Sequence, residues 1–224
     1  LSPLDTLEQM RVTMRAMATE LQSVGVNMTM APVLDLNTGV SDVIGDRSFG
    51  GCHHVVSTLA EQMMVTLQAT GMPSIAKHFP GHGSVKADSH VDLPVDSRGY
   101  AAIMQTDLVP FSRLAHQYDA VMPAHILFDQ VDSQVVTFSR HWLVDVLRNQ
   151  LGFDGVVMSD DLTMAAAAHV GSYADRARAA LSAGCDMLIV CNHVDGVSAV
   201  LDEAASLAPK TPEARLSRYL RHFH

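Results

Sequence analysis

The chain of 224 residues has no apolar run near the ~20 residues that a membrane span requires, and no secretory leader is visible. Lysine and arginine form no run, and 24 acidic residues against 15 basic ones give a formal charge of −9. Because phosphate neutralisation needs clustered cations, this balance argues against a nucleic-acid partner. The expected partners therefore include neither a membrane nor a nucleic acid.

Cysteine and the familiar cofactor motifs are also scarce. The three cysteines are an odd number, and Cys185 and Cys191 flank the apolar run 187–190. Thiols in or near a core strand are expected to be reduced, which favours a reducing compartment and a cytoplasmic location. No Gly-x-Gly-x-x-Gly turn, Cys-x-x-Cys pair or His-Glu-x-x-His pattern occurs, so neither a dinucleotide site nor a metal site has a motif in its favour.

What is present is an alternation of strands and helices. A hydrophobic fraction of 48% and a charged fraction of 17% are typical of a soluble globular enzyme. Apolar spacing and glycine stops predict helices at 7–24, 56–67, 99–116 with a bend at Pro110, 140–151 and 172–183. Short apolar runs predict strands at 26–34, 74–78, 120–125, 156–160 and 187–191.

This rhythm predicts parallel strands joined by crossover helices. Four of the strands end in a polar or ionisable residue: Asp35, His78, His125 and Asp160. In a β/α barrel such ends converge on the face that carries the active site. A doubly wound open sheet is the rival fold, and the missing glycine-rich turn argues against it. Five βα units are too few for a closed barrel of eight strands.

The most informative stretch is Lys77-His78-Phe79-Pro80-Gly81-His82-Gly83, followed by Asp88-Ser89-His90. Its proline and glycines forbid a helix, so it is predicted to be a polar loop at a strand end. Residues two apart in an extended loop point to the same side, which would let Asp88 orient the ring of His90 as a proton donor. The alternative is a solvated polar loop. A metal site built from His78, His82, Asp88 and His90 is a further, weaker alternative.

Other candidates are more ambiguous. Asp160 and Asp161 end a strand, so only one is expected to face inward; Asp161 suits a helix N-cap and Asp160 suits chemistry. Arg47 suits either a polar ligand or a structural pair with an acid. His125 is expected to be a packed core histidine. Met164 is expected to form site wall or core and is counted among the substrate-binding candidates.

Taken together, these motifs resemble glycoside hydrolase family 3, and within it the single-domain β-N-acetylhexosaminidases of bacterial peptidoglycan recycling. The resemblance rests on the 77–83 and 88–90 motifs and on Ser159-Asp160-Asp161, with support from 31–36, 44–49, 122–125 and 183–187. It implies an α/β fold of the (β/α)8 TIM-barrel type. The five strands correspond to about the last five βα units, within a single catalytic domain over 1–224.

The resemblance also implies roles. Asp160 would be the nucleophile of a retaining exo-β-N-acetylglucosaminidase, His90 its acid/base and Asp88 the partner of His90. Lys77, His78 and Arg47 would hold the sugar hydroxyls. The implied substrate is a small N-acetylglucosamine-containing muropeptide, with no cofactor, no metal and a monomeric protein.

The chain departs from that family's pattern in one respect. The family's Asp-x-Glu-Gly-Gly-Arg-type sugar-binding segment and three early strands are not found, and the first residue is Leu1. We therefore expect this sequence to be a portion of a longer protein. A metal-dependent amidohydrolase on the same barrel and an inactive, truncated sugar-binding remnant are the alternative functions.

Overall fold

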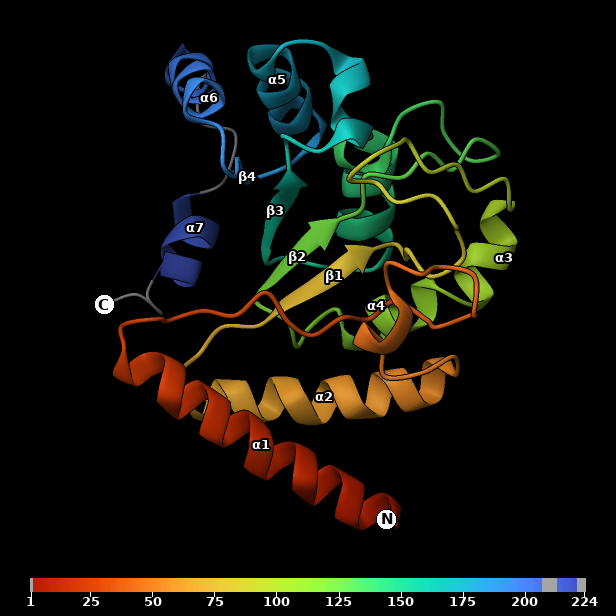
Figure 1. Ribbon diagram of the computed structural model, residues 1–224, viewed down its shortest axis with the longest axis vertical. Coiled ribbons are helices and arrows are strands. Elements are labelled where there is room, and N and C mark those ends of the chain that lie inside the picture. Colours follow the sequence, from red (N-terminus) through yellow and green to blue (C-terminus); the bar gives the residue numbers. More distant parts are fainter. Residues whose placement is uncertain (1, 207–212, 221–224) are drawn as a thin grey trace.

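The structure, a computed structural model, describes residues 2–206 and 213–220 (Figure 1). The strands are β1 (Ile75–Phe79), β2 (Ala120–Pro123), β3 (Val156–Asp161) and β4 (Met187–Ile189). The α-helices are α1 (Pro3–Ser23), α2 (His53–Ala69), α3 (Tyr100–Gln105), α4 (Leu108–Leu114), α5 (Tyr173–Ala183), α6 (Val194–Ser206) and α7 (Glu213–Leu220). Three 3-10 helices, η1 (Gly45–Arg47), η2 (Val136–Phe138) and η4 (Ala165–Val170), and one π-helix, η3 (His141–Gln150), complete the elements.

The strands form one parallel sheet in the order β1-β2-β3-β4. Each is joined to the next by a helical crossover, as parallel pairing requires. All the carboxyl ends therefore lie at one edge of the sheet, and in Figure 1 the arrowheads of β1 and β2 point to the side where the long loops gather. This is the edge to which the predicted site residues belong.

Alternation along the strands divides the core between the two faces of the sheet. Ala76, Val121 and Val157 belong to the large apolar cluster that the crossover helices cover. Their neighbours in sequence form a smaller cluster on the opposite, inner face: Ile75, Ala120, Met122, Val156 and Met158, with Met28, Met187, Ile189 and Tyr219. Because Tyr219 belongs to α7, that helix packs against the inner face, apart from the row of crossover helices (Figure 1).

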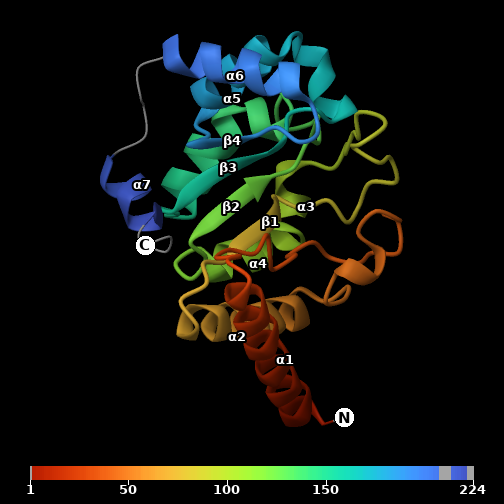
Figure 2. The ribbon, with the colours of Figure 1, turned by 60° about the vertical axis from the view of Figure 1, so that its left-hand side comes forward.

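The termini of the helices follow the local sequence. Ser2 begins α1 in a capping box with Asp5, and Ser172 begins α5 in the same way with Asp175. Gly184, with φ 126°, ends α5 in a conformation that side-chain-bearing residues rarely adopt. Helix α1 packs along α2 through a cluster that includes Ala18, and it projects away from the sheet in both views (Figures 1 and 2).

The predicted strand at 26–34 is wrong as a regular element. The segment lies beside β1, but it makes only two isolated parallel bridges, Thr29 to Ser74 and Val33 to Lys77. Pro32 has no N–H for a ladder, although its carbonyl accepts from the Lys77 amide at 3.1 Å. The described residues thus hold four regular strands and one irregular neighbour, in place of the five predicted.

Two helical predictions also differ from the structure, and two observed helices lie outside the predictions. The stretch 99–116 breaks between α3 and α4 at Thr106 and Asp107, not at Pro110. Pro110 lies in the first turn of α4, where backbone N–H groups have no intrahelical acceptor, so it costs no hydrogen bond. The segment 140–151 forms the π-helix η3, and α6 and α7 were not predicted.

Candidate active site

A cavity of ≈ 210 Å³ opens at the carboxyl ends of the strands. Five of the predicted site residues line it: Arg47, Lys77, His78, His90 and Asp160. They come from η1, from β1 and the loop that follows it, and from the end of β3. The structure therefore brings together in one cavity side chains that are more than 100 positions apart in the sequence, as convergence of parallel strand ends predicts.

A buried carboxylate organises the loop after β1. Asp35 has no exposed surface and accepts hydrogen bonds from the backbone N–H of His78 at 3.2 Å and of His82 at 2.7 Å. Its Oδ2 also lies 2.7 Å from Nδ1 of the His78 ring. Burial would raise the pKa of Asp35, but the neighbouring His78 and His82 groups outweigh it and hold that pKa below its usual range. Asp35 thus fixes the backbone and one ring of the 77–83 motif, a role that its position at a predicted strand end did not reveal.

Close packing explains a glycine of this motif. A Cβ at Gly83 would overlap the carbonyl oxygen of Leu36, the residue after the buried carboxylate. The Gly83 carbonyl in turn accepts from the Thr38 hydroxyl at 2.6 Å. The loop after β1 is therefore pressed against the segment that follows residue 34, without space for a side chain at this point.

Asp160 lies half-buried at the end of β3, and its Oδ1 accepts the Asp161 backbone N–H at 2.8 Å. Burial pushes its pKa up, while the His125 and His78 rings, that N–H and Lys77 act in the opposite direction and hold the pKa below its ordinary value. The carboxylate is therefore ionised at neutral pH. This is the state that a nucleophile requires.

Asp161 differs from its predicted position. It lines the same cavity as Asp160, because the register of β3 against β4 shifts between Met158 and Asp161 and breaks the strict alternation. Its carboxylate accepts from the Thr163 amide at 2.9 Å and the Cys191 amide at 3.0 Å, so it holds a turn and does not cap an α-helix. Met164, not Asp161, is the N-cap residue of η4.

Two cations stand at the wall of the cavity. Lys77 is half-buried, and burial together with the positive charge of Arg47 lowers its pKa, with Asp160 and Asp35 opposing. Arg47 is exposed and donates to the Val43 carbonyl at 3.1 Å. Within the described part of the chain it makes no ion pair, so the alternative of a structural Arg–Asp pair is not observed. The guanidinium remains available to a polar ligand.

Asp88 and His90 form the predicted pair. Asp88 Oδ1 lies 2.7 Å from Nδ1 of His90 and accepts the His90 backbone N–H at 2.9 Å. The backbone N–H, followed by the ring, lowers the pKa of Asp88. The side chains are 38% and 62% exposed, and of the two only His90 lines the cavity, with Asp88 outside the lining. Because Nδ1 is bound to Asp88, proton exchange with a ligand falls to Nε2.

Some predictions do not fit the cavity. Met164 is buried and lies outside the lining, whose apolar side chains are Met30, Val43, Ile44, Met122 and Ile189. His125 is fully buried between the Thr137 hydroxyl at 2.8 Å and the Asp161 carbonyl at 3.0 Å, as expected for a packed histidine. Burial lowers its pKa.

The weaker metal alternative also finds no support in the geometry. In the two described ranges, no three or more histidine, cysteine, aspartate or glutamate side chains are grouped so as to hold a metal ion. Helices that are both long and apolar enough to cross a membrane are likewise not found among the described residues.

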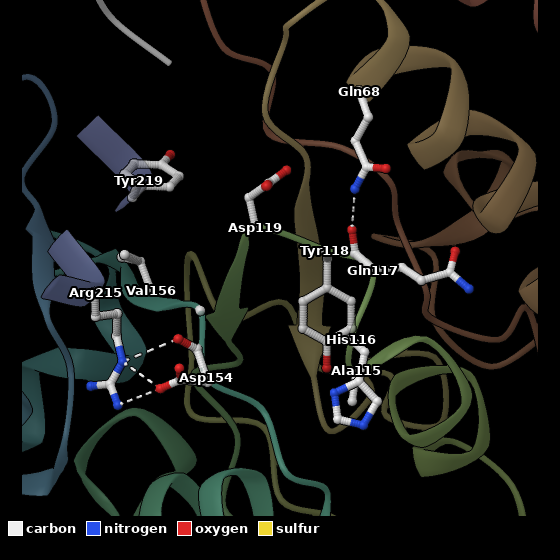
Figure 3. A pocket seen from close by; sticks show the side chains of 11 residues that line it. Gln68, Ala115, His116, Gln117, Tyr118, Asp119, Asp154, Val156, Arg215 and Tyr219 are labelled. Atoms are coloured by element: carbon white, nitrogen blue, oxygen red, sulfur yellow. Dashed lines mark hydrogen bonds and ion pairs between the residues drawn. The ribbon is translucent and has the colours of Figure 1, made fainter. Parts of the chain in front are cut away.

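A second cavity, of ≈ 260 Å³, lies at the other end of the strands (Figure 3). Asp119 and Asp154, which line it, precede β2 and β3, and Arg215 from α7 donates to Asp154 at 3.0 Å. None of the predicted site residues lines this cavity. The polar groups expected to carry chemistry are thus confined to the carboxyl ends of the strands.

Comparison with known proteins identifies the family of the chain. Residues 1–222 match the model of the glycosyl hydrolase family 3 N terminal domain. A beta-hexosaminidase of Pseudomonas aeruginosa is 52% identical over 203 residues, which are 90% of this chain and 60% of that protein. A beta-hexosaminidase of Thiobacillus denitrificans is 48% identical over 216 residues, 96% of this chain and 60% of that protein. Among solved structures, NagZ from Neisseria gonorrhoeae in complex with N-trifluoroacetyl-D-glucosamine has a TM-score of 0.87 at 38% identity, covering 97% of this chain and 62% of that chain.

The chain therefore belongs to glycosyl hydrolase family 3, as the sequence motifs predict. Its four parallel strands and crossover helices are part of a (β/α)8 barrel of the TIM type. The chain spans about 60% of the length of the curated relatives that it matches.

Proposed function

We propose that the protein that contains this chain is a retaining exo-β-N-acetylglucosaminidase. One observation carries the proposal: an oriented imidazole, His90, and an ionised carboxylate, Asp160, line the same cavity at the carboxyl ends of the strands. The relatives named beta-hexosaminidase and the neighbour bound to an N-trifluoroacetyl sugar support the choice of an N-acetylated substrate.

In the proposed first step, a carboxylate oxygen of Asp160 attacks the anomeric carbon of the sugar. The bond from that carbon to the leaving oxygen breaks, and Nε2 of His90 gives its proton to the departing oxygen. Asp88 remains hydrogen bonded to Nδ1, so it holds the ring and stabilises the protonated imidazole. The product of this step is a glycosyl ester on Asp160.

In the second step, His90 takes a proton from a water molecule whose oxygen attacks the anomeric carbon. The ester bond to Asp160 breaks and the carboxylate is regenerated, so the two displacements retain the configuration of the sugar. Lys77, Arg47 and His78 line the same cavity and would bind the sugar hydroxyls. A peptidoglycan-derived muropeptide as substrate, a cytoplasmic location and a monomeric state are parts of the same proposal.

Trapping of the ester tests the mechanism. The protein at its full natural length is incubated with a 2-acetamido-2-deoxy-5-fluoro glycosyl fluoride, digested and analysed by mass spectrometry. The expected result is one sugar adduct on Asp160, which is lost in Asp160→Asn and kept in the neighbouring control Asp161→Asn. An adduct on another carboxylate would move the nucleophile. Absence of both adduct and turnover would contradict the proposed function.

A further inference from the structure

The residue between the two members of the exposed pair is buried. The side chains of Asp88 and His90 are 38% and 62% exposed, whereas Ser89 is only 3% exposed. Residues 88–92 form a turn, in which the Asp88 carbonyl accepts the backbone N–H groups of Val91 at 3.0 Å and Asp92 at 2.9 Å, and this turn places Ser89 in the protein interior while its two neighbours face solvent. Among residues 88–90, the side chain of Ser89 is thus the one that is placed to bind this segment to the rest of the barrel.

Ser89 is bound from two directions. Its hydroxyl lies 3.1 Å from Nε2 of His82, in the loop after β1. Its carbonyl accepts the backbone N–H of Ala166 at 3.1 Å, in η4 after β3. Since β3 ends at the Asp160–Asp161 pair, Ser89 links the loop that carries His90 to the two strands that supply the other half of the site.

The partner of the Ser89 hydroxyl is itself held in place. His82 is 3% exposed, its backbone N–H donates to Asp35 at 2.7 Å, and its ring lies edge-on to that of His78 with the centroids 6.0 Å apart. Burial lowers the pKa of His82, so the ring is neutral at neutral pH. Within the described residues its Nδ1 has no hydrogen-bond partner, which leaves Ser89 as the group that the ring binds.

Resting on the proposed function, we infer that Ser89 is a positioning residue that sets the place of His90 through the Ser89–His82 hydrogen bond. Asp88 fixes the orientation of the His90 ring, but both belong to the same exposed segment and cannot fix that segment relative to Asp160. Ser89 supplies this second constraint. A proton donor displaced by about 1 Å transfers its proton poorly, so the effect should fall on the step that protonates the leaving oxygen.

The test compares two glycosides in the protein at its full natural length. The p-nitrophenyl N-acetyl-β-glucosaminide has a leaving group that needs little protonation, and the methyl glycoside has one that needs a proton. In Ser89→Ala, kcat/KM, which reports the step that releases the leaving group, should fall at least about tenfold more for the methyl glycoside than for the aryl glycoside. Ser84→Ala, at a half-buried position of the same loop without a side-chain hydrogen bond among the described residues, should leave the ratio unchanged.

Three further variants make the outcome decisive. Ser89→Thr keeps the hydroxyl and should restore the wild-type ratio, and Ser89→Cys, which keeps the volume but bonds weakly, replaces Ser89→Ala if that variant does not fold. In a His90→Ala background, Ser89→Ala should cause no further selective loss. Equal losses on both glycosides or an additional selective loss without His90 would each overturn the inference.

Failure of the proposed function gives a different result. Wild-type protein that cleaves neither glycoside refutes the proposed function and not the link between Ser89 and His82. That link is then judged by nitrogen NMR of the His82 ring, whose Nε2 resonance should shift in Ser89→Ala and stay unchanged in Ser84→Ala. An unchanged resonance in both variants would overturn the link.

Discussion

Replacing Asp35 by asparagine should destabilise the protein strongly, because this buried carboxylate is the acceptor for two backbone amides and one ring of the loop after β1. The amide side chain would keep one oxygen and turn an N–H group toward donors at His78 or His82. A lost charge-assisted bond contributes about 1.5–3 kcal/mol, and an unsatisfied buried donor costs about 1–3 kcal/mol. The expected decrease in the free energy of unfolding is therefore about 3–5 kcal/mol at pH 7.

The effect should depend on pH in one direction. The pKa of Asp35 is lower in the folded protein than its ordinary value, despite the opposing effect of burial. A lowered carboxyl pKa stabilises the folded state fully above the unfolded-state pKa of about 3.9, and this contribution is lost as the pH falls through the folded-state pKa. The difference between wild type and Asp35→Asn should thus be largest near neutral pH and shrink below about pH 4.

Urea unfolding at several pH values measures both quantities. With a slope of about 2–3 kcal/mol per M, the midpoint of Asp35→Asn should lie roughly 1–2 M below wild type at pH 7. Asp46→Asn is the matched control, since Asp46 is exposed in η1 and its loss should move the midpoint by less than about 0.3 M. A midpoint for Asp35→Asn as close to wild type as that of the control, or a difference that does not vary with pH, would refute this account of the network.

Three other outcomes are expected. Arg98→Ala should lower the free energy of unfolding by about 3 kcal/mol, because it leaves the buried carboxylates of Asp96 and Asp107 without their cation. The control Arg178→Ala, at an exposed position, should lower it by less than about 1 kcal/mol, and urea unfolding measures both. Gly83→Ala should prevent normal folding, because its Cβ would overlap the Leu36 carbonyl, whereas Gly99→Ala, whose Cβ meets nothing within 4 Å, should fold. Circular dichroism distinguishes the two variants, and a native spectrum for Gly83→Ala would contradict the packing at this loop. A thiol reagent should modify Cys52 and Cys191, which are exposed, in the native state, and Cys185 only after unfolding, because burial protects that thiol and raises its pKa. Rapid modification of all three cysteines in the native protein would contradict the burial of Cys185.

Much of the site could be predicted from the sequence because its chemistry is local. Asp88 and His90 lie two residues apart and pair as predicted, although the backbone that brings them together is a turn and not the extended loop that we expected. The convergence of Lys77 and Asp160 needed only the assumption of parallel strands, whose carboxyl ends share one edge. Gly184 ends a helix as its position predicts.

The remainder depends on contacts between distant segments. The break between α3 and α4 occurs where Asp107 accepts from Arg98 at 2.8 Å, an interaction that no helical periodicity contains. The burial of Ser89 depends on His82 and Ala166, and a serine between two polar residues looks like a solvated one in the sequence. Apolar spacing does not indicate which methionines reach a cavity: Met30 and Met122 line it, whereas Met164 takes the core position that was the other expectation for it.

The apolar cluster on the inner face of the sheet contains four methionines, and these make the fold sensitive to oxidants. Met28 and Met187 are half-buried there, and Met122 and Met158 are buried. Conversion of a methionine to its sulfoxide would place a polar, bulkier group in this apolar cluster, where the Tyr219 hydroxyl, 3.5 Å from the Met28 sulfur, is a hydrogen-bond donor for Met28. Within this cluster, peroxide damage would therefore begin at Met28 and Met187 and, as the packing loosens, reach Met122 at the wall of the cavity.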